Sequence, residues 1–300
     1  MIVNSEQKSY TVPLVLSIIL ISFSAIFVKW SEAPPTILAM YRMWFACVFL
    51  LPVLWIKRKE IIQIHFTQWS LLFCSGIFLA LHFGLWFASL TLTTVASSTI
   101  ILALQPIIAL IGGFFIFKER TTTSAITTMT VAIIGAMMVG WGDFGLSDEA
   151  ILGDILSFLS VIAVVGYLMI GQNIVQHMSH WIYSFSVFFF TAFLLTGYNL
   201  VAHIPLFSYE SREWGLFVLL AIIPTLAHLI HNWLLRYMNA TTISMSILGE
   251  PVGATILAVL LLGEKLVYWQ LIGGVLVLIG VFLFLIQQQK QRSTLHEKSA

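Results

Sequence analysis

Charged residues are scarce in this sequence. They make up 9% of its 300 residues, while 59% are hydrophobic, and the mean hydropathy is +0.98. A soluble domain usually carries about 25% charged residues. A chain this poor in charge cannot cover a water-facing surface of its own size, so most of its surface must face lipid. The formal net charge of +1 gives no sign of a nucleic-acid partner.

Cysteine is nearly absent as well. Cys47 and Cys74 both lie in apolar stretches, which predicts packing rather than a disulfide framework or a metal site. No metal or cofactor is expected. Residues 1–10 are polar and lack a basic n-region, and the apolar segment after them is too long for a signal peptide. We expect that segment to remain as a membrane span.

Long apolar segments dominate what is present. A membrane helix needs roughly 20 mostly apolar residues. Ten segments qualify: 11–29, 35–56, 68–90, 95–117, 123–141, 151–172, 181–201, 214–235, 241–262 and 267–287. The links between them are short and leave little chain for a soluble domain. The predicted fold class is therefore an all-α membrane protein with ten transmembrane helices.

The basic residues predict an orientation, because lysine and arginine collect on the cytoplasmic side of a membrane. With the N-terminus in the cytoplasm, the inner side holds ten basic residues and the outer side three, and Arg42 lies within a span. We therefore expect a multi-pass protein of the cell membrane with both termini cytoplasmic. The short tail 1–10 and the polar tail 288–300, which we expect to be disordered, then lie inside.

An internal repeat divides the chain. SSTIILALQPIIALIGGFFIFKER, ending at Arg120, resembles TISMSILGEPVGATILAVLLLGEK, ending at Lys265, with Pro106 matching Pro251 at a shift of 145 residues. Gly135 matches Gly280 at the same shift. Each half, 11–141 and 151–287, holds five predicted spans. Because five is odd, the second half enters the bilayer from the opposite face, which is an inverted repeat typical of secondary transporters.

Several short motifs occur in a fixed order along the chain. They are PPTILAMYRMWFA from Pro34, HFGLWFASL at 82–90, TTVASSTI at 93–100, Gly153-Asp154, and two proline-to-glutamate segments ending at Glu119 and Glu264. On these motifs, residues 11–287 resemble the EamA-type branch of the drug/metabolite transporter superfamily. The first span departs from the family pattern, since ISFSAIFVKW lacks the Trp-Gly often found before the lysine. The resemblance implies a cavity between two halves and transport without ATP hydrolysis. It leaves the substrate open, because members carry amino acids, nucleobases, sugars, amines and other metabolites.

Glu250 is the sharpest candidate for a substrate-binding residue. It lies near the middle of a predicted span, where a charge is costly and usually faces a cavity or a partner. Its carboxylate can bind a substrate ammonium or exchange a proton; the plainer alternative is a protonated glutamate hydrogen-bonded within the bundle. Gln105 occupies the matching place in the first half. It can contact the substrate or form a hydrogen bond to another helix, and we favour the hydrogen bond. Pro106 and Pro251 follow these two residues and predict helix kinks.

Two further helix faces carry polar candidates. His82 and Trp86 share a face, and can either line a cavity and cap a cation or form an aromatic packing face. His228, His231 and Asn232 form another face. No carboxylate or cysteine near that face in sequence completes a metal site, so it predicts either pocket lining or interhelical hydrogen bonds.

Arg42 lies about seven residues into its span. It can attract a substrate carboxylate, snorkel to the outer surface or pair with carbonyl groups. The resembling family has arginine here whatever the substrate, which favours a structural role.

The leading functional prediction is a secondary transporter, working as an exporter of a small organic metabolite such as an amino acid or an amine. It would use alternating access and would couple to protons or to the solute gradient. The predicted partners are this small molecule and the lipid bilayer. One alternative is a carrier for neutral solutes such as nucleobases. Others are an intramembrane enzyme that uses His228 and His231, and a channel, although one chain with inverted halves favours a carrier.

Overall fold

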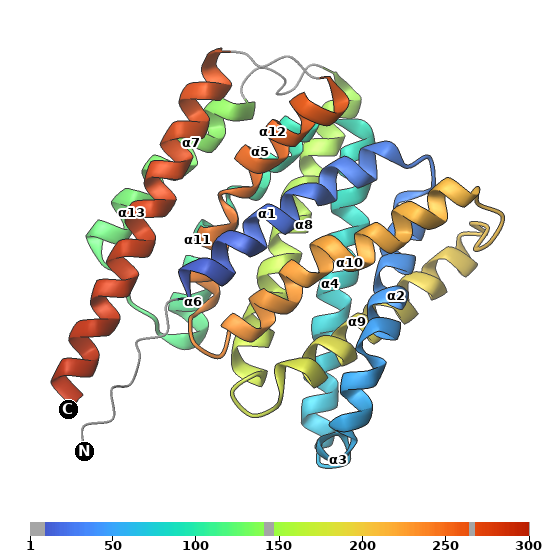
Figure 1. Ribbon diagram of the computed structural model, residues 1–300, viewed down its shortest axis with the longest axis horizontal. Coiled ribbons are helices and arrows are strands. Elements are labelled where there is room, and N and C mark those ends of the chain that lie inside the picture. Colours follow the sequence, from blue (N-terminus) through green and yellow to red (C-terminus); the bar gives the residue numbers. More distant parts are fainter. Residues whose placement is uncertain (1–9, 141–146, 264–267, 300) are drawn as a thin grey trace.

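The computed structural model describes residues 10–140, 147–263 and 268–299 (Figure 1). Every regular element within these ranges is an α-helix, as predicted. The first half of the chain holds α1 (Thr11–Trp30), α2 (Pro35–Ile56), α3 (Arg58–Ile61), α4 (Phe66–Leu92), α5 (Val95–Leu102), α6 (Gln105–Phe117) and α7 (Thr123–Gly140). The second half holds α8 (Asp148–Ile174), α9 (His180–Val201), α10 (Ser211–Leu234), α11 (Ala240–Ile247), α12 (Glu250–Leu262) and α13 (Tyr268–Ser299).

Local sequence explains where several helices begin. Proline occupies the first position of α2, where its missing N–H is not needed. At the start of α8, the Ser147 hydroxyl accepts a hydrogen bond from the Ala150 N–H at 3.1 Å, and two acidic residues occupy the first turn. Along the spans, helices satisfy their own backbone groups, which lipid cannot do.

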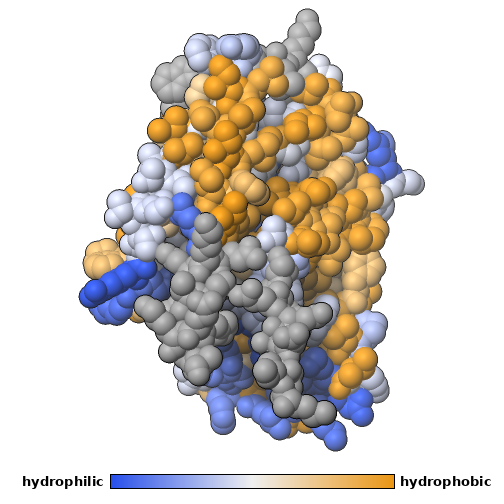
Figure 2. Space-filling view, turned by 60° about the vertical axis from the view of Figure 1, so that its left-hand side comes forward, coloured by the Kyte–Doolittle hydropathy of each residue, from blue (hydrophilic) through white to orange (hydrophobic). Residues whose placement is uncertain are grey.

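Seven segments of the described residues form helices that are long and apolar enough to cross a membrane, and the chain is accordingly a multi-pass membrane protein. Three shorter apolar helices accompany them, at Gln105–Phe117, Thr123–Met138 and Leu271–Gln287. Figure 2 shows a wide hydrophobic surface on the side that carries α7 and α13, with hydrophilic residues gathered at one end.

Two predicted spans are not continuous helices. The span 95–117 is interrupted at residues 103–104, between α5 and α6, and the span 241–262 at residues 248–249, between α11 and α12. Each interruption comes directly before a proline-containing pair, Gln105-Pro106 or Glu250-Pro251. Proline starts a helix well but cannot donate a backbone hydrogen bond to the turn before it.

The C-terminal end also differs from expectation. The expected disordered tail is instead the last part of α13, which continues to Ser299. Glutamine, lysine and arginine follow Ile286, and these residues favour helix almost as strongly as alanine does, so the apolar helix before them is not stopped there.

Helix packing produces a main body and a peripheral pair (Figure 1). In the main body, α4 packs on α8 and α9, α1 packs on α10 and α12, and α2 packs on α9 and α10. The peripheral pair is α7 and α13. A Cβ placed on Gly135 would lie 2.7 Å from the backbone nitrogen of Val277, and one on Gly280 would lie 2.7 Å from that of Ala132. The two helices therefore approach each other closely at these two glycines.

Candidate functional site

Arg42 lies at the centre of the main body. Its side chain has no exposed surface. Its Nε donates to the hydroxyl of Thr225 on α10 at 3.1 Å, and its Nη1 donates to the hydroxyl of Ser24 on α1 at 3.3 Å. Its guanidinium carbon lies 4.3 Å from the centre of the Phe83 ring on α4, a cation–π contact. Arg42 therefore joins four helices, and the snorkelling alternative is wrong.

Glu250 is the first residue of α12 and is 2% exposed. Arg42 and Glu250 interact electrostatically, but no ion pair joins them within 4.0 Å. Among the described residues, Oε1 of Glu250 and Nη2 of Arg42 have no hydrogen-bond partner. Buried polar groups are nearly always hydrogen-bonded in folded proteins. These two buried ionisable groups therefore keep hydrogen-bonding capacity that the neighbouring described side chains do not use.

A group of aromatic and imidazole rings lies around Arg42. The His82 ring stacks on Trp86, with ring centres 5.9 Å apart and an angle of 10° between the planes. Its Nδ1 donates to the Ser160 carbonyl at 3.0 Å, which fixes the orientation of the ring. The His228 ring meets Phe83 edge-on at 5.3 Å. Trp86 Nε1 and His228 Nδ1 are buried without a partner in the part of the chain that the structure describes.

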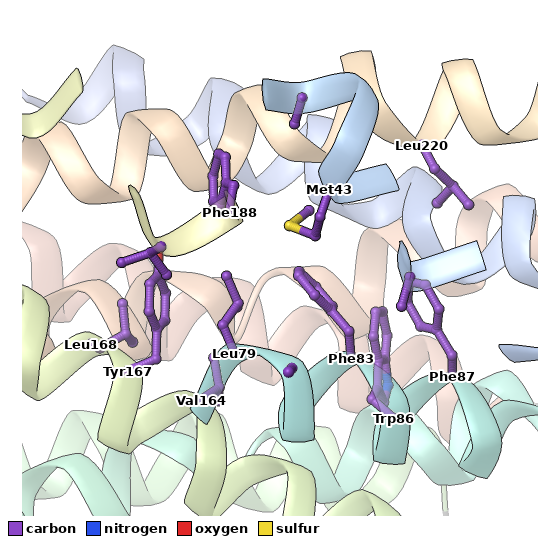
Figure 3. Close-up of a cluster of buried hydrophobic side chains, with 14 of the residues drawn as sticks. Met43, Leu79, Phe83, Trp86, Phe87, Val164, Tyr167, Leu168, Phe188 and Leu220 are labelled. Carbon is purple, nitrogen blue, oxygen red and sulfur yellow. The ribbon is translucent and has the colours of Figure 1, made fainter. Parts of the chain in front are cut away.

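Figure 3 shows the apolar lining of this region. Phe83, Trp86 and Phe87 project from α4 toward Met43 on α2. We call the residues Arg42, His82, Phe83, Trp86, His228 and Glu250 the central cluster. It combines one cation, one carboxylic acid, two imidazoles and flat aromatic surfaces, with little access to solvent in this conformation.

The other sequence-predicted residues make hydrogen bonds between helices. Asn232 accepts from the Tyr167 hydroxyl and donates to the Ser184 hydroxyl at 2.9 Å. His231 Nε2 lies 2.9 Å from the hydroxyl of Ser17. Separately, Gln105 Nε2 donates to the hydroxyl of Ser244 at 3.2 Å. These contacts agree with the alternative that Asn232, His231 and Gln105 form hydrogen bonds between helices.

One buried polar network was not singled out from the sequence. The hydroxyls of Ser89, Ser98 and Ser157 lie 2.8 to 2.9 Å from one another and connect α4, α5 and α8. Next to them, Asp154 accepts a hydrogen bond from Ser97 at 2.9 Å. An acidic residue within a span is a signal that sequence reading can use, but Asp154 was treated only as part of a family motif.

The fold and the central cluster define a multi-pass α-helical membrane protein whose buried charges come from both ends of the chain. The EamA-like transporter family matches at residues 10–141 and again at 151–286, and the chain belongs to this family. It is therefore a transporter of a small-molecule substrate.

Individual relatives are distant. The uncharacterised transporter YxxF of Bacillus subtilis (strain 168) is 22% identical over 303 residues, covering 96% of this chain and 93% of that protein. An uncharacterised transporter of Clostridium kluyveri is 23% identical over 201 residues, covering 64% of each chain. One crystal structure matches with a TM-score of 0.75 at 17% identity, over 91% of this chain and 95% of that one, which supports the fold alone.

Proposed function

We propose that this protein is a secondary transporter that exports a small metabolite with an amino group, such as an amino acid or an amine, across the cell membrane. The observation that carries the proposal is Glu250, a buried acid with an oxygen that lacks a partner among the described residues and that interacts electrostatically with the buried Arg42. Intramembrane acids with this character usually belong to a substrate or proton pathway.

The architecture we propose is ten spans in two inverted halves, with both termini in the cytoplasm. The helix contacts support it. At the shift of 145 residues the counterparts are α1 and α8, α2 and α9, α4 and α10, α5 and α11, α6 and α12, and α7 and α13. When each helix is replaced by its counterpart, the α4–α8 contact becomes α10–α1 and the α5–α12 contact becomes α11–α6, and both of these contacts are present. The α2–α9 and α7–α13 contacts map onto themselves. The double match to one family is a second, independent support. In this layout the seven long apolar helices account for seven spans, and the three shorter apolar helices belong to the remaining three.

Alternating access follows from the same layout. The interrupted helices α5–α6 and α11–α12 contact each other, α5 touching α12 and α6 touching α11, and broken helices form the substrate site in many transporters. Their second segments start at Gln105 and Glu250, so the partial positive charge of each helix start lies inside the protein. Exchange of conformations between the two halves would open the central cluster to one side and then to the other.

The chemistry of the central cluster favours an amino group as the recognised feature. A carboxylate at Glu250 binds an ammonium group directly and can take up or release a proton as the substrate leaves. The stacked His82 and Trp86 rings offer a flat surface that attracts a cation. Arg42 repels an ammonium group, but its Nη2 can still donate a hydrogen bond. A substrate with both an ammonium and a carboxylate group can therefore place the first at Glu250 and the second at Arg42.

The alternatives have less support. A carrier for neutral solutes would use the same rings but leaves Glu250 without a role. For an intramembrane enzyme, His228 and His231 would have to act on one ligand. Their rings do meet edge-on, with centres 6.1 Å apart, but His231 Nε2 is already paired with the Ser17 hydroxyl and the His228 ring packs on Phe83. No group of three or more His, Cys, Asp or Glu side chains in the described ranges could hold a metal ion.

A thermal-shift screen tests the proposal. Detergent-purified protein is heated with amino acids, amines, nucleobases or sugars, because a ligand that binds only the folded state raises the melting temperature. We expect an amino compound to stabilise the parent and the control Glu210→Gln, in which an exposed acid is removed, but not Glu250→Gln. Stabilisation of all three proteins by a nucleobase or a sugar, with no effect of amino compounds, would contradict the proposed substrate class.

Transport by the same ligand is then measured in proteoliposomes. A carrier gives saturable flux and counterflow, in which unlabelled substrate on one side drives uptake of labelled substrate. Flux that rises linearly with concentration and shows no counterflow would identify a channel instead.

A further inference from the structure

A cavity lies away from the central cluster, at one end of the bundle. Its volume is about 160 Å³, and it is lined by residues of α2, α3, α4 and α9. The walls are almost entirely apolar, and Ser186 supplies the polar exception. The apolar residues include Leu54, Ile61, Trp69, Phe189 and Phe190. Because α2 ends at Ile56 and α4 begins at Phe66, this cavity lies near a membrane surface, where tryptophans such as Trp69 are common.

A basic segment adjoins the cavity. Lys57, Arg58 and Lys59 come directly before Glu60 and Ile61, and Ile61 is one of the wall residues. Lys57 pairs with Glu60 at 2.8 Å. Arg58 lies over an exposed tryptophan ring at 5.0 Å, and it and Lys59 are exposed. Lys57 and Arg236 also act electrostatically on a histidine at the start of α9. Positive charge therefore surrounds the end of the bundle at which the cavity lies.

The opposite end of the bundle shows that this cavity is not required by the fold. At the shift of 145 residues, Ser186 corresponds to Tyr41, Trp69 to Trp214, and Ile61 to Leu206. There the Tyr41 ring packs edge-on against Trp214, with centres 4.8 Å apart, and its hydroxyl donates to the Leu206 carbonyl at 2.7 Å. A large aromatic side chain thus fills the counterpart region, whereas the small Ser186 leaves space.

We propose that this cavity binds an anionic phospholipid of the surrounding membrane. One acyl chain occupies the apolar space between α2, α4 and α9, where it fills the cavity and packs against its apolar walls. Arg58 and Lys59 hold the phosphate-containing headgroup, since basic side chains at a membrane surface attract anionic lipids. The charge of the adjoining segment argues for an anionic lipid over a zwitterionic one. This site goes beyond the proposed transport function and does not depend on the identity of the substrate.

The test measures lipid binding to the purified full-length protein by native mass spectrometry. The protein is titrated with phosphatidylglycerol or with phosphatidylcholine of the same acyl chains. Each basic residue near a surface contributes roughly a factor of five to anionic lipid binding, so two residues predict roughly twenty-five-fold tighter binding of phosphatidylglycerol. Equal affinity of the parent protein for both lipids would overturn the proposal.

Variants locate the site. Arg58→Gln with Lys59→Gln should remove the preference for phosphatidylglycerol, while the control Lys118→Gln with Arg120→Gln, which removes the same two charge types at another helix end, should keep it. Ser186→Tyr copies the residue of the filled end and should weaken binding of both lipids. Ile61→Trp fills the cavity from the short helix α3, and it replaces Ser186→Tyr in the test if that variant does not fold. Unchanged binding by a folded cavity-filling variant, or loss of the preference only in the control, would refute this location.

Discussion

Lys118 and Gly263 end α6 and α12 in the same left-handed backbone conformation, with φ of 57° and 71°, although they lie 145 residues apart. The hydrogen bonds at these ends match too. The N–H at the cap of α6 donates to the Gly113 carbonyl, and the N–H at the cap of α12 donates to the Ala258 carbonyl. The two half-helices therefore end by the same local geometry, which is the pattern expected of repeated halves.

This relationship predicts opposite effects of two substitutions. A left-handed backbone costs a residue with a side chain about 1 kcal/mol or more, and costs glycine almost nothing. Lys118→Gly should stabilise the protein by about 1 kcal/mol, and Gly263→Ala should destabilise it by a similar amount. Unfolding of the two variants in detergent measures both changes. A destabilised Lys118→Gly would show that the lysine side chain contributes more than the backbone costs.

The contact between α7 and α13 leaves no space for a side chain at Gly135. Because a Cβ there would meet the backbone nitrogen of Val277, the helices must move apart, and Gly135→Ala should cost about 1 to 3 kcal/mol. Gly197, on α9, is the control, since a Cβ there meets nothing within 4 Å. Gly197→Ala should stabilise the protein by about 0.5 to 1 kcal/mol through helix propensity. Equal thermal shifts for the two variants would contradict the close packing.

Arg42 should tolerate no conservative replacement. Lysine keeps the charge but cannot reach Thr225 and Ser24 with two donors while stacking on Phe83. We expect Arg42→Lys to lower the free energy of unfolding by about 2 to 3 kcal/mol, because hydrogen bonds to a buried charge are lost. Ser24→Ala, which removes one acceptor, should cost about 1 kcal/mol. If Arg42→Lys unfolds like the parent, these contacts contribute little to stability, and a direct role in substrate binding becomes the better explanation.

The proposed orientation is tested by cysteine labelling. In a background of Cys47→Ala and Cys74→Ala, an added Gln63→Cys lies in the link 57–67, and Glu210→Cys lies in the link 202–213. Both positions are exposed. A membrane-impermeant maleimide should label the Glu210 variant in intact cells and the Gln63 variant only after permeabilisation. The reverse pattern would invert the topology and with it the positive-inside interpretation.

The sequence identifies candidate residues by their polarity within predicted spans but does not say which of them share a site. Glu250, His82, Trp86 and His228 were chosen because polar side chains are rare and costly within a span. Their separation in sequence gives no distance between them, so the interaction of Glu250 with Arg42 from the other half was not foreseen. Arg42 itself was favoured as structural, and its contacts across four helices agree with that, while its unused donor leaves room for a second role.

The amino-acid sequence by itself determined the membrane setting, the positions of the apolar helices and the membership of a transporter family, because lipid imposes length and polarity on every span. Only the tertiary structure decided that two spans are interrupted, directly before Gln105 and Glu250. It also decided that the side chains of Asn232 and Gln105 form hydrogen bonds to other helices, while one oxygen of Glu250 forms none among the described residues. Only the tertiary structure, too, placed a cavity where Ser186 is and a packed ring where Tyr41 is. The physical reason is the same in each case: hydropathy is a property of one segment, whereas hydrogen bonding and packing depend on side chains that the fold brings together from distant segments.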